Sequence, residues 1–254
     1  MSGHSKWSQI KRKKGVNDAQ RGKLFTKAAR EIIMAAKVGG GDADTNARLR
    51  FAIQKAKEVN MPNDNIKRAI ARAVGGAEGS NIEEITYEAY AQGGVAMVIE
   101  CMTDNKNRTF PEIKTVINKA GANLAEKGSV GYMFQKRGVF TFDGNLVSED
   151  KIMEVALNHD VEDIKSADDK TIEVIIEVAG YDKLKEDFEK NNLKFLNAEI
   201  TMRPTVSVPV EDKDVAHKIL NVIERLEDHD DVQNVYSNAD ISEAVFKAIE
   251  QEAG

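Results

Sequence analysis

Apolar residues recur with a helical period through the first 75 residues of the chain. Each repeat places one apolar stripe on one side of a helix, and the glycines at 39–41 and the Met61-Pro62 turn separate the repeats. The expected helices are 18–38, capped by Asn17 or Asp18, then 45–59, capped by Asp44 or Thr45, and 63–74. The pattern predicts a small helical bundle, preceded by a basic arm or short helix.

Beyond residue 80 the apolar period changes from helical to alternating, which is typical of strands. The expected strands are 85–90, 95–102, 130–134, 139–142, 161–167, 171–178, 195–202, 204–210 and 232–237, and the expected helices are 110–120, 149–158, 181–191, 212–226 and a short one after 241. Between 139 and 202 the order is βαββαβ, the order of a ferredoxin-like unit.

The order of elements indicates an α+β protein with several domains. We expect an N-terminal helical bundle followed by two ferredoxin-like α+β domains, the third inserted into the second. The expected boundaries are 1–78 for the basic helical domain, 82–134 plus 204–241 for the second domain, 135–203 for the inserted domain and 242–254 for a C-terminal helix or tail.

Charge is strongly segregated along the chain, although the net charge is only −6. Residues 1–75 contain 17 Lys plus Arg against 6 Asp plus Glu, whereas the other 179 residues contain 19 against 36. Such asymmetry is typical of a surface that binds a polyanion. The acidic domains are expected to stay away from the polymer, where they are free for protein partners or self-association.

The expected first long helix separates cations from apolar residues. At 100° per residue, Lys23, Lys27, Arg30 and Lys37 fall within about 80° of one another, opposite the apolar side. The candidate nucleic-acid-binding residues are Lys6, Trp7, Lys11, Arg12, Lys13, Lys14, Arg21, Lys23, Lys27, Arg30, Lys37, Arg48, Lys55, Arg68 and Arg72. Trp7 could stack on a base or pack the arm onto the bundle. The helices 48–59 and 63–74 could form a helix-turn-helix, although any bundle offers such a pair.

The sequence contains no pattern that indicates catalysis or a bound metal. The four histidines, at 4, 159, 217 and 229, are far apart without metal-ligand spacing, and each is expected to be a surface residue. The acidic run 227–231 lacks the spacing of a calcium loop. Cys101 is expected to pack in a strand, while Glu83, Glu84 and Glu88 are expected to face solvent or the basic domain. We therefore expect no catalytic residues, no cofactor and no enzyme activity.

Several blocks of residues resemble the signature of the YebC/PmpR family. They are Gly3-His4-Ser5-Lys6-Trp7 with Ile10, Lys13, Lys14, Asp18, Arg21 and Phe25; Met61 to Ile66 with Arg68, Ala69 and Ile70; Tyr87, Glu88, Tyr90, Gly93 and Gly94; Asn107, Arg108 and Thr109; and Gly128, Ser129 and Val130. The resemblance implies a helical first domain and two α+β domains. It also implies a cytoplasmic DNA-binding transcriptional regulator, or a translation activator that acts at the ribosome as related mitochondrial and bacterial proteins do.

Three functions follow as hypotheses. The first is a cytoplasmic regulator of transcription that binds duplex DNA through residues 1–75, and the alternative is a ribosome-associated translation factor that binds structured RNA. Both partners present phosphates, so charge does not choose between them. An enzyme is the third hypothesis, and it rests only on a cleft between the two α+β domains. No apolar segment is long enough for a membrane helix, so no membrane partner is expected.

Overall fold

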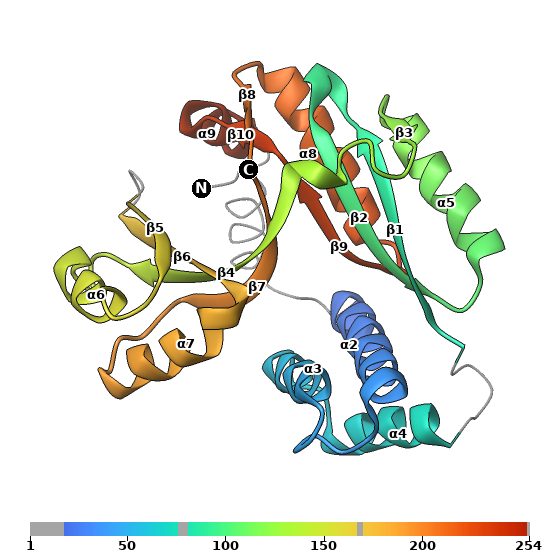
Figure 1. Cartoon of the computed structure of the whole chain (residues 1–254). Coiled ribbons are helices and arrows are strands. Elements are labelled where there is room, and N and C mark those ends of the chain that lie inside the picture. Colours follow the sequence, from blue (N-terminus) through green and yellow to red (C-terminus); the bar gives the residue numbers. More distant parts are fainter. Residues whose placement is uncertain (1–17, 76–80, 167–169, 253–254) are drawn as a thin grey trace. The chain divides into compact units, whose positions relative to one another are not determined.

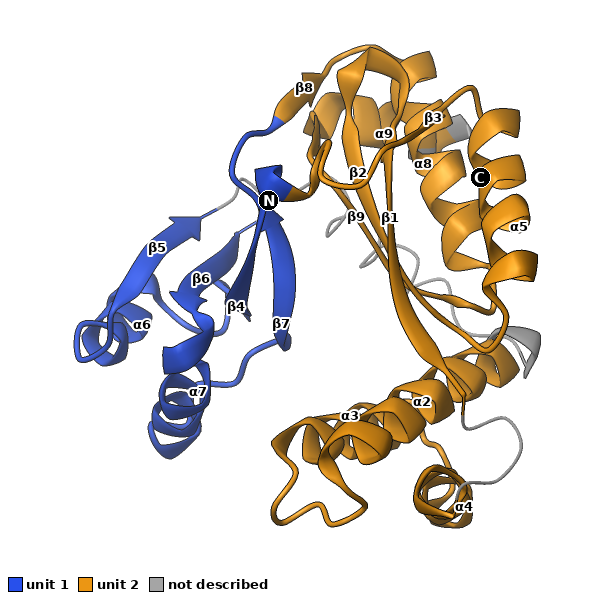
Figure 2. Cartoon of the chain, turned by 45° about the vertical axis from the view of Figure 1, so that its right-hand side comes forward, with its two compact units in different colours: residues 1–2, 132–207 blue, residues 3–131, 208–254 orange. Residues whose placement is uncertain are grey.

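The computed structural model describes residues 18–75, 81–166 and 170–252. The fold consists of helices at the N-terminal end followed by α+β units (Figure 1). Among the described residues, two compact units are distinguished by their internal contacts (Figure 2): those within 132–207 form one, and those within 18–131 and 208–252 form the other. The chain thus leaves the larger unit at 131 and returns to it at 208, as expected for an inserted domain.

Within the described residues, the helical part consists of three helices, α2 (Asp18–Gly39), α3 (Ala47–Glu58) and α4 (Asn63–Val74). Their apolar stripes form one core that includes Ile32, Leu49 and Ile66. Met102 of the adjoining sheet and Ile82, which directly precedes the first strand of that sheet, belong to the same core. The helical bundle and the sheet are therefore joined by shared apolar packing as well as by the chain.

The start of α3 differs from the prediction, because its N-cap is Asn46 and neither Asp44 nor Thr45. The Asn46 side chain is buried, accepts from the Leu49 amide at 3.0 Å, and donates to the carbonyls of Ala35 (2.8 Å) and Gly40 (2.7 Å). A Cβ on Gly39 would lie 2.6 Å from this side chain. One asparagine thus caps α3 and holds the α2–α3 turn, a role that needs both an acceptor and two donors.

The second domain is built on a four-stranded sheet of order β3-β1-β2-β9 with antiparallel pairs. Its elements are β1 (Glu83–Tyr90), η1 (Gln92–Gly94), β2 (Ala96–Thr103), α5 (Lys106–Lys119), β3 (Asn123–Ala125), β8 (Val208–Val210), α8 (Lys213–Glu227), β9 (Val232–Ser237), β10 (Ala239–Ile241) and α9 (Glu243–Glu252). The core includes Ile99 of β2, Ile113 and Ile117 of α5, and Leu220 of α8.

Two strands of this domain were predicted wrongly. The strand expected at 130–134 is absent; the edge of the sheet is β3, and residues 131–133 form the short helix η2 (Gly131–Met133). The strand expected at 204–210 is reduced to β8, which pairs in parallel with β10 outside the main sheet. Short edge pairings carry little apolar alternation, so the pattern does not locate them.

A buried carboxylate fixes the loop that leads to the inserted domain. Glu88 of β1 is 6% exposed and accepts from the amides of Gly128 (2.7 Å), Val130 (2.6 Å) and Gly131 (2.9 Å). Burial by itself would raise the pKa of Glu88, but these backbone hydrogen bonds outweigh it and hold the pKa below its usual value. The expectation that Glu88 faces solvent or the basic domain is wrong, because an anion surrounded by amides can be buried.

The inserted domain has the ferredoxin-like arrangement, with strand order β5-β6-β4-β7 and antiparallel pairs. Its elements are β4 (Phe134–Asp143), α6 (Glu149–Ala156), β5 (Val161–Ser166), β6 (Thr171–Glu177), η3 (Val178–Gly180), α7 (Tyr181–Lys190) and β7 (Asn197–Pro204). Phe140 stacks on Tyr181 at 4.8 Å and meets Phe188 edge-on at 5.2 Å. The predicted fold class is confirmed.

Candidate nucleic-acid interface

Three cations of the predicted row on α2 contact the C-terminal end of α8. Lys23 Nζ donates to the Asp228 carbonyl at 3.0 Å, Lys27 Nζ donates to the Glu227 carbonyl at 2.6 Å, and Arg30 donates to the Asp230 carbonyl. The last carbonyls of a helix have no partner within the helix and carry partial negative charge. Lys23 and Lys27 therefore donate to carbonyls at the C-terminal end of α8, about 200 residues away in the sequence, and Arg30 donates to a carbonyl in the segment that follows it.

Lys27 lies in the middle of this contact. Burial lowers the pKa of its amine, and the carboxylates of Glu227, Asp228 and Asp230 offset only part of that effect. An amine that is already desolvated and paired has little capacity left for a phosphate. The structure thus brings Lys23, Lys27 and Arg30 together, but it turns them toward the protein itself.

Asp231, which follows α8, is the most connected carboxylate of this contact and is 1% exposed. It accepts from Thr109 Oγ1 at 2.6 Å and Arg108 Nη2 at 2.7 Å, and it pairs with Arg30 Nη1 at 2.8 Å. Burial would raise the pKa of Asp231, but the hydrogen bonds from Thr109 and Arg108 and the charge of Arg30 outweigh it, so the pKa is lowered. This role could not be predicted from the sequence, because Asp231 sits within an ordinary acidic run.

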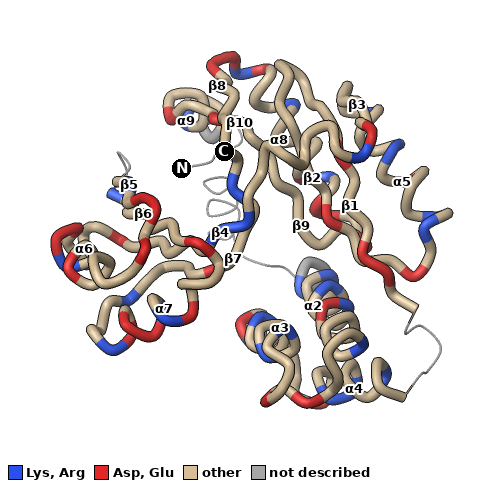
Figure 3. The backbone as a smooth tube through the Cα atoms, in the orientation of Figure 1, with Lys and Arg blue, Asp and Glu red and all other residues tan. Residues whose placement is uncertain are grey.

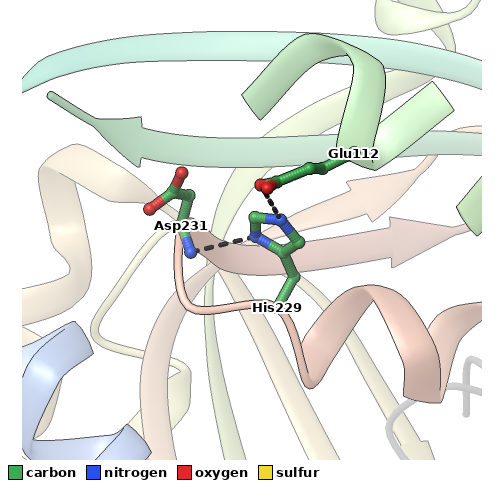
Figure 4. A group of neighbouring side chains, drawn as sticks. All are labelled: Glu112, His229 and Asp231. Carbon is green, nitrogen blue, oxygen red and sulfur yellow. Dashed lines mark hydrogen bonds and ion pairs between the residues drawn. The ribbon is translucent and has the colours of Figure 1, made fainter. Parts of the chain in front are cut away.

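Glu112, His229 and Asp231 lie close enough to offer three ligand atoms to one ion (Figure 4). Their hydrogen bonds use those atoms already. His229 Nδ1 accepts from the Asp231 amide at 3.1 Å, so Nε2 carries the proton and donates to Glu112 at 3.0 Å. Because two guanidinium groups also contact Asp231, the chemistry of the cluster favours a hydrogen-bonded network over a metal site.

The expectation that every histidine is a surface residue is wrong within the described part. The His159 side chain is 4% exposed and lies 3.0 Å from Asp187, and that of His229 is 16% exposed. His217 is exposed as expected, and His4 lies outside the described residues. Cys101 is buried as expected, and burial raises the pKa of its thiol to about 12.

The remaining predicted cations differ in how available they are. Arg48 donates to Glu31 at 3.3 Å and also pairs with Glu84, which bears out the expected contact of Glu84 with the basic domain. Lys37 is exposed, with its amine 3.5 Å from the Ile82 carbonyl. Arg68 is exposed and hydrogen-bonds to its own helix at Asn65 (2.9 Å).

Lys and Arg residues recur along α3 and α4 (Figure 3), and several of them are exposed to solvent. Lys55 and Arg72, both in the candidate set, are exposed there, as is Arg21 on α2. Lys57 and Lys67 are also exposed, although they are not among the predicted residues. Their positions on the polar side of each predicted helix were the signal that could have found them. The predicted Lys6, Trp7, Lys11, Arg12, Lys13 and Lys14 lie outside the described residues.

Comparisons with known proteins cover nearly the whole chain. Residues 5–76 match the family model of the TACO1/YebC protein N-terminal domain, and residues 82–239 match that of the TACO1/YebC second and third domain. Within the described residues, no helix has the length and apolar character to cross a membrane.

Individual relatives are similar along their full length. A probable transcriptional regulatory protein from Syntrophus aciditrophicus is 47% identical over 98% of this chain and 99% of its own, and one from Trichlorobacter lovleyi is 50% identical over 95% and 97%. The crystal structure of a conserved hypothetical protein from Aquifex aeolicus has a TM-score of 0.78 and 40% identity, covering 89% of this chain and 93% of that one. With the helical part, the sheets and the inserted domain all accounted for, the resemblance seen in the sequence is confirmed, and the chain belongs to the TACO1/YebC family.

Proposed function

We propose that this protein is a non-catalytic regulator of gene expression that binds nucleic acid through phosphate contacts from its helical part. The names of its relatives, probable transcriptional regulatory proteins, support a role in regulation. We propose duplex DNA as the ligand, because transcription acts on it, and structured RNA as the alternative. The Cys101 thiol, with a pKa of about 12, stays protonated at neutral pH and is therefore no nucleophile.

The observation that carries this proposal is a set of three exposed amines on α3 and α4. Lys55, Lys57 and Lys67 form no ion pair with any carboxylate in the described part of the chain, in contrast to Lys23 and Arg30 of α2. An unpaired, hydrated amine can approach a phosphate and release condensed counterions without first breaking an internal contact. We therefore assign phosphate binding to the outer faces of α3 and α4, together with the exposed Arg68 and Arg72.

The mode of contact follows from the residue types. Lysine is a flexible point charge that suits a phosphate, whereas reading a base edge favours planar groups in a fixed position. Binding by such a face is expected to depend strongly on salt and only weakly on base sequence.

The test replaces Lys55, Lys57 and Lys67 with glutamine in the full chain. Affinity for a mixed-sequence DNA duplex and for a structured RNA is measured in parallel between about 50 and 200 mM salt, because phosphate contacts weaken strongly over that range. We expect a loss of about tenfold or more in affinity, and a salt slope smaller by about 0.9 for each duplex contact removed.

A matched variant replaces Lys151, Lys183 and Lys194 of the inserted domain with glutamine. These lysines are also exposed, and their replacement changes the net charge by the same amount. It is expected to bind like the wild type. Equal loss in both triple variants would mean that only net charge matters, and unchanged affinity in the first would refute the assigned face. Tighter binding to the RNA than to the duplex would support regulation of translation in place of regulation of transcription.

A further inference from the structure

The second domain is acidic overall, yet its α5–α8 groove is lined by cations. Residues 82–131 and 208–254 contain 9 Lys plus Arg against 19 Asp plus Glu. Three of those nine cations, Lys119, Lys218 and Arg225, line one open pocket of about 530 Å³ between the C-terminal end of α5 and α8. His217, Asn221 and Gln92 add polar groups, and no carboxylate lines it.

The cations of the α5–α8 groove are available to a ligand. Lys119, His217, Lys218 and Arg225 are all exposed, and none forms an ion pair with a carboxylate of the described residues. Lys119 and Arg225 lie in the last turns of their helices, where a cation is favourable to the helix itself. Lys218 lies in the second turn of α8, so its positive charge does not stabilise the C-terminal end of the helix.

The side chains on α8 also form a line. Residues 217, 221 and 225 are four apart and lie above one another on the exposed side of the helix, while Ile219, Leu220 and Ile223 face the core. The line is about 12 Å long at 1.5 Å per residue. A linear array of polar and cationic groups suits a row of phosphates better than a single small anion.

The groove and the helical part both involve the C-terminal end of α8. Arg225 lines the pocket from the last turn of α8, and the carbonyl of Glu227, two residues later, accepts from Lys27 of α2.

We propose that the α5–α8 groove is a second site for the phosphates of the same nucleic acid that the helical part binds. The inference rests on the proposed function and extends nucleic-acid binding to the second domain, which its acidic net charge predicted to stay away from the polymer. The acidic surface around the groove would then confine the strand to it, because phosphates are repelled elsewhere on the domain.

The experiment uses the full chain with Lys119, Lys218 and Arg225 replaced by glutamine. Its affinity for the same duplex and structured RNA is measured against salt and compared with wild type and with K114Q/K127Q, which alters two exposed lysines of this domain outside the groove. We expect a three- to tenfold loss for the groove variant, with a salt slope on duplex DNA that is smaller by about 2.7, which is about 0.9 for each of the three contacts removed. The K114Q/K127Q variant is expected to stay within twofold of wild type.

The outcomes separate this inference from the proposed function. If the α3–α4 variant loses affinity while the groove variant binds like K114Q/K127Q, the groove is no phosphate site and the proposed function survives. If wild type binds neither polymer, both proposals fall. Saturable binding of inorganic phosphate or a mononucleotide to the groove, with polymer affinity unchanged in the groove variant, would overturn the inference in favour of a small-anion site.

Discussion

Replacing Asp231 with asparagine tests whether the α2–α8 contact depends on its buried carboxylate. The side chain is 1% exposed and has three donors, one of them the Arg30 guanidinium, whose side chain is 18% exposed. Asparagine keeps the shape and one acceptor but removes the charge. Removing one partner of a buried ion pair costs about 3–5 kcal/mol, because the other charge stays desolvated and unpaired.

The expected cost lies at the lower end of that range. The Arg108 side chain is 42% exposed, so water can replace much of its lost interaction with the Asp231 carboxylate. Only the Arg30 guanidinium is left poorly solvated. We expect the free energy of unfolding to fall by about 3 kcal/mol. For a folding unit of this size that is a decrease of about 6–12 °C in Tm. Urea and thermal unfolding followed by circular dichroism measure both.

The dependence on pH gives a second check on Asp231. Its pKa is lowered in the folded protein, since burial is outweighed by the hydrogen bonds from Thr109 and Arg108 and by the charge of Arg30. Such a group adds stability above its unfolded pKa of about 3.9 and loses that contribution as the pH falls through the lower folded value. The difference between wild type and D231N should be constant from about pH 7 to 5 and shrink below about pH 4.

Asp230→Asn is the matched control, because Asp230 is exposed and offers Arg30 its main-chain carbonyl, which the substitution retains. It should change stability by less than about 0.5 kcal/mol. If D231N were no more destabilising than D230N, the buried carboxylate would not hold the contact together.

Two further substitutions test the buried polar groups that fix loops. Glu88→Gln should destabilise by about 1–3 kcal/mol and speed amide exchange at Gly128 and Val130, because the glutamine amide cannot accept from all three backbone donors; unchanged exchange at those amides would contradict it. Asn46→Ala removes the cap of α3 and leaves the Ala35 carbonyl without its side-chain donor, so unfolding by urea should show a loss of about 2 kcal/mol, whereas Thr45→Ala, at the cap position expected from sequence, should cost less.

Local pattern was sufficient to predict the fold class and most of the elements. Apolar periods located α2, α3 and α4, and the βαββαβ order identified the inserted domain, because these signals depend only on which side of an element is buried. The excess of positive charge in the first 75 residues and its deficit elsewhere were equally visible from the sequence. The sheet edge at β3 was not, because a three-residue strand is determined by its partner β1.

The partner of each charge was decided only by the tertiary structure. Lys27 and Lys55 are both lysines on predicted polar faces, yet one is desolvated against the end of α8 and the other is exposed to solvent. Electrostatic and hydrogen-bond energies depend on distance and on hydration, and neither can be read from positions 200 residues apart in the chain. The sequence alone could therefore count the cations of this protein, whereas the fold determined which of them bind the protein itself and which remain available for a partner.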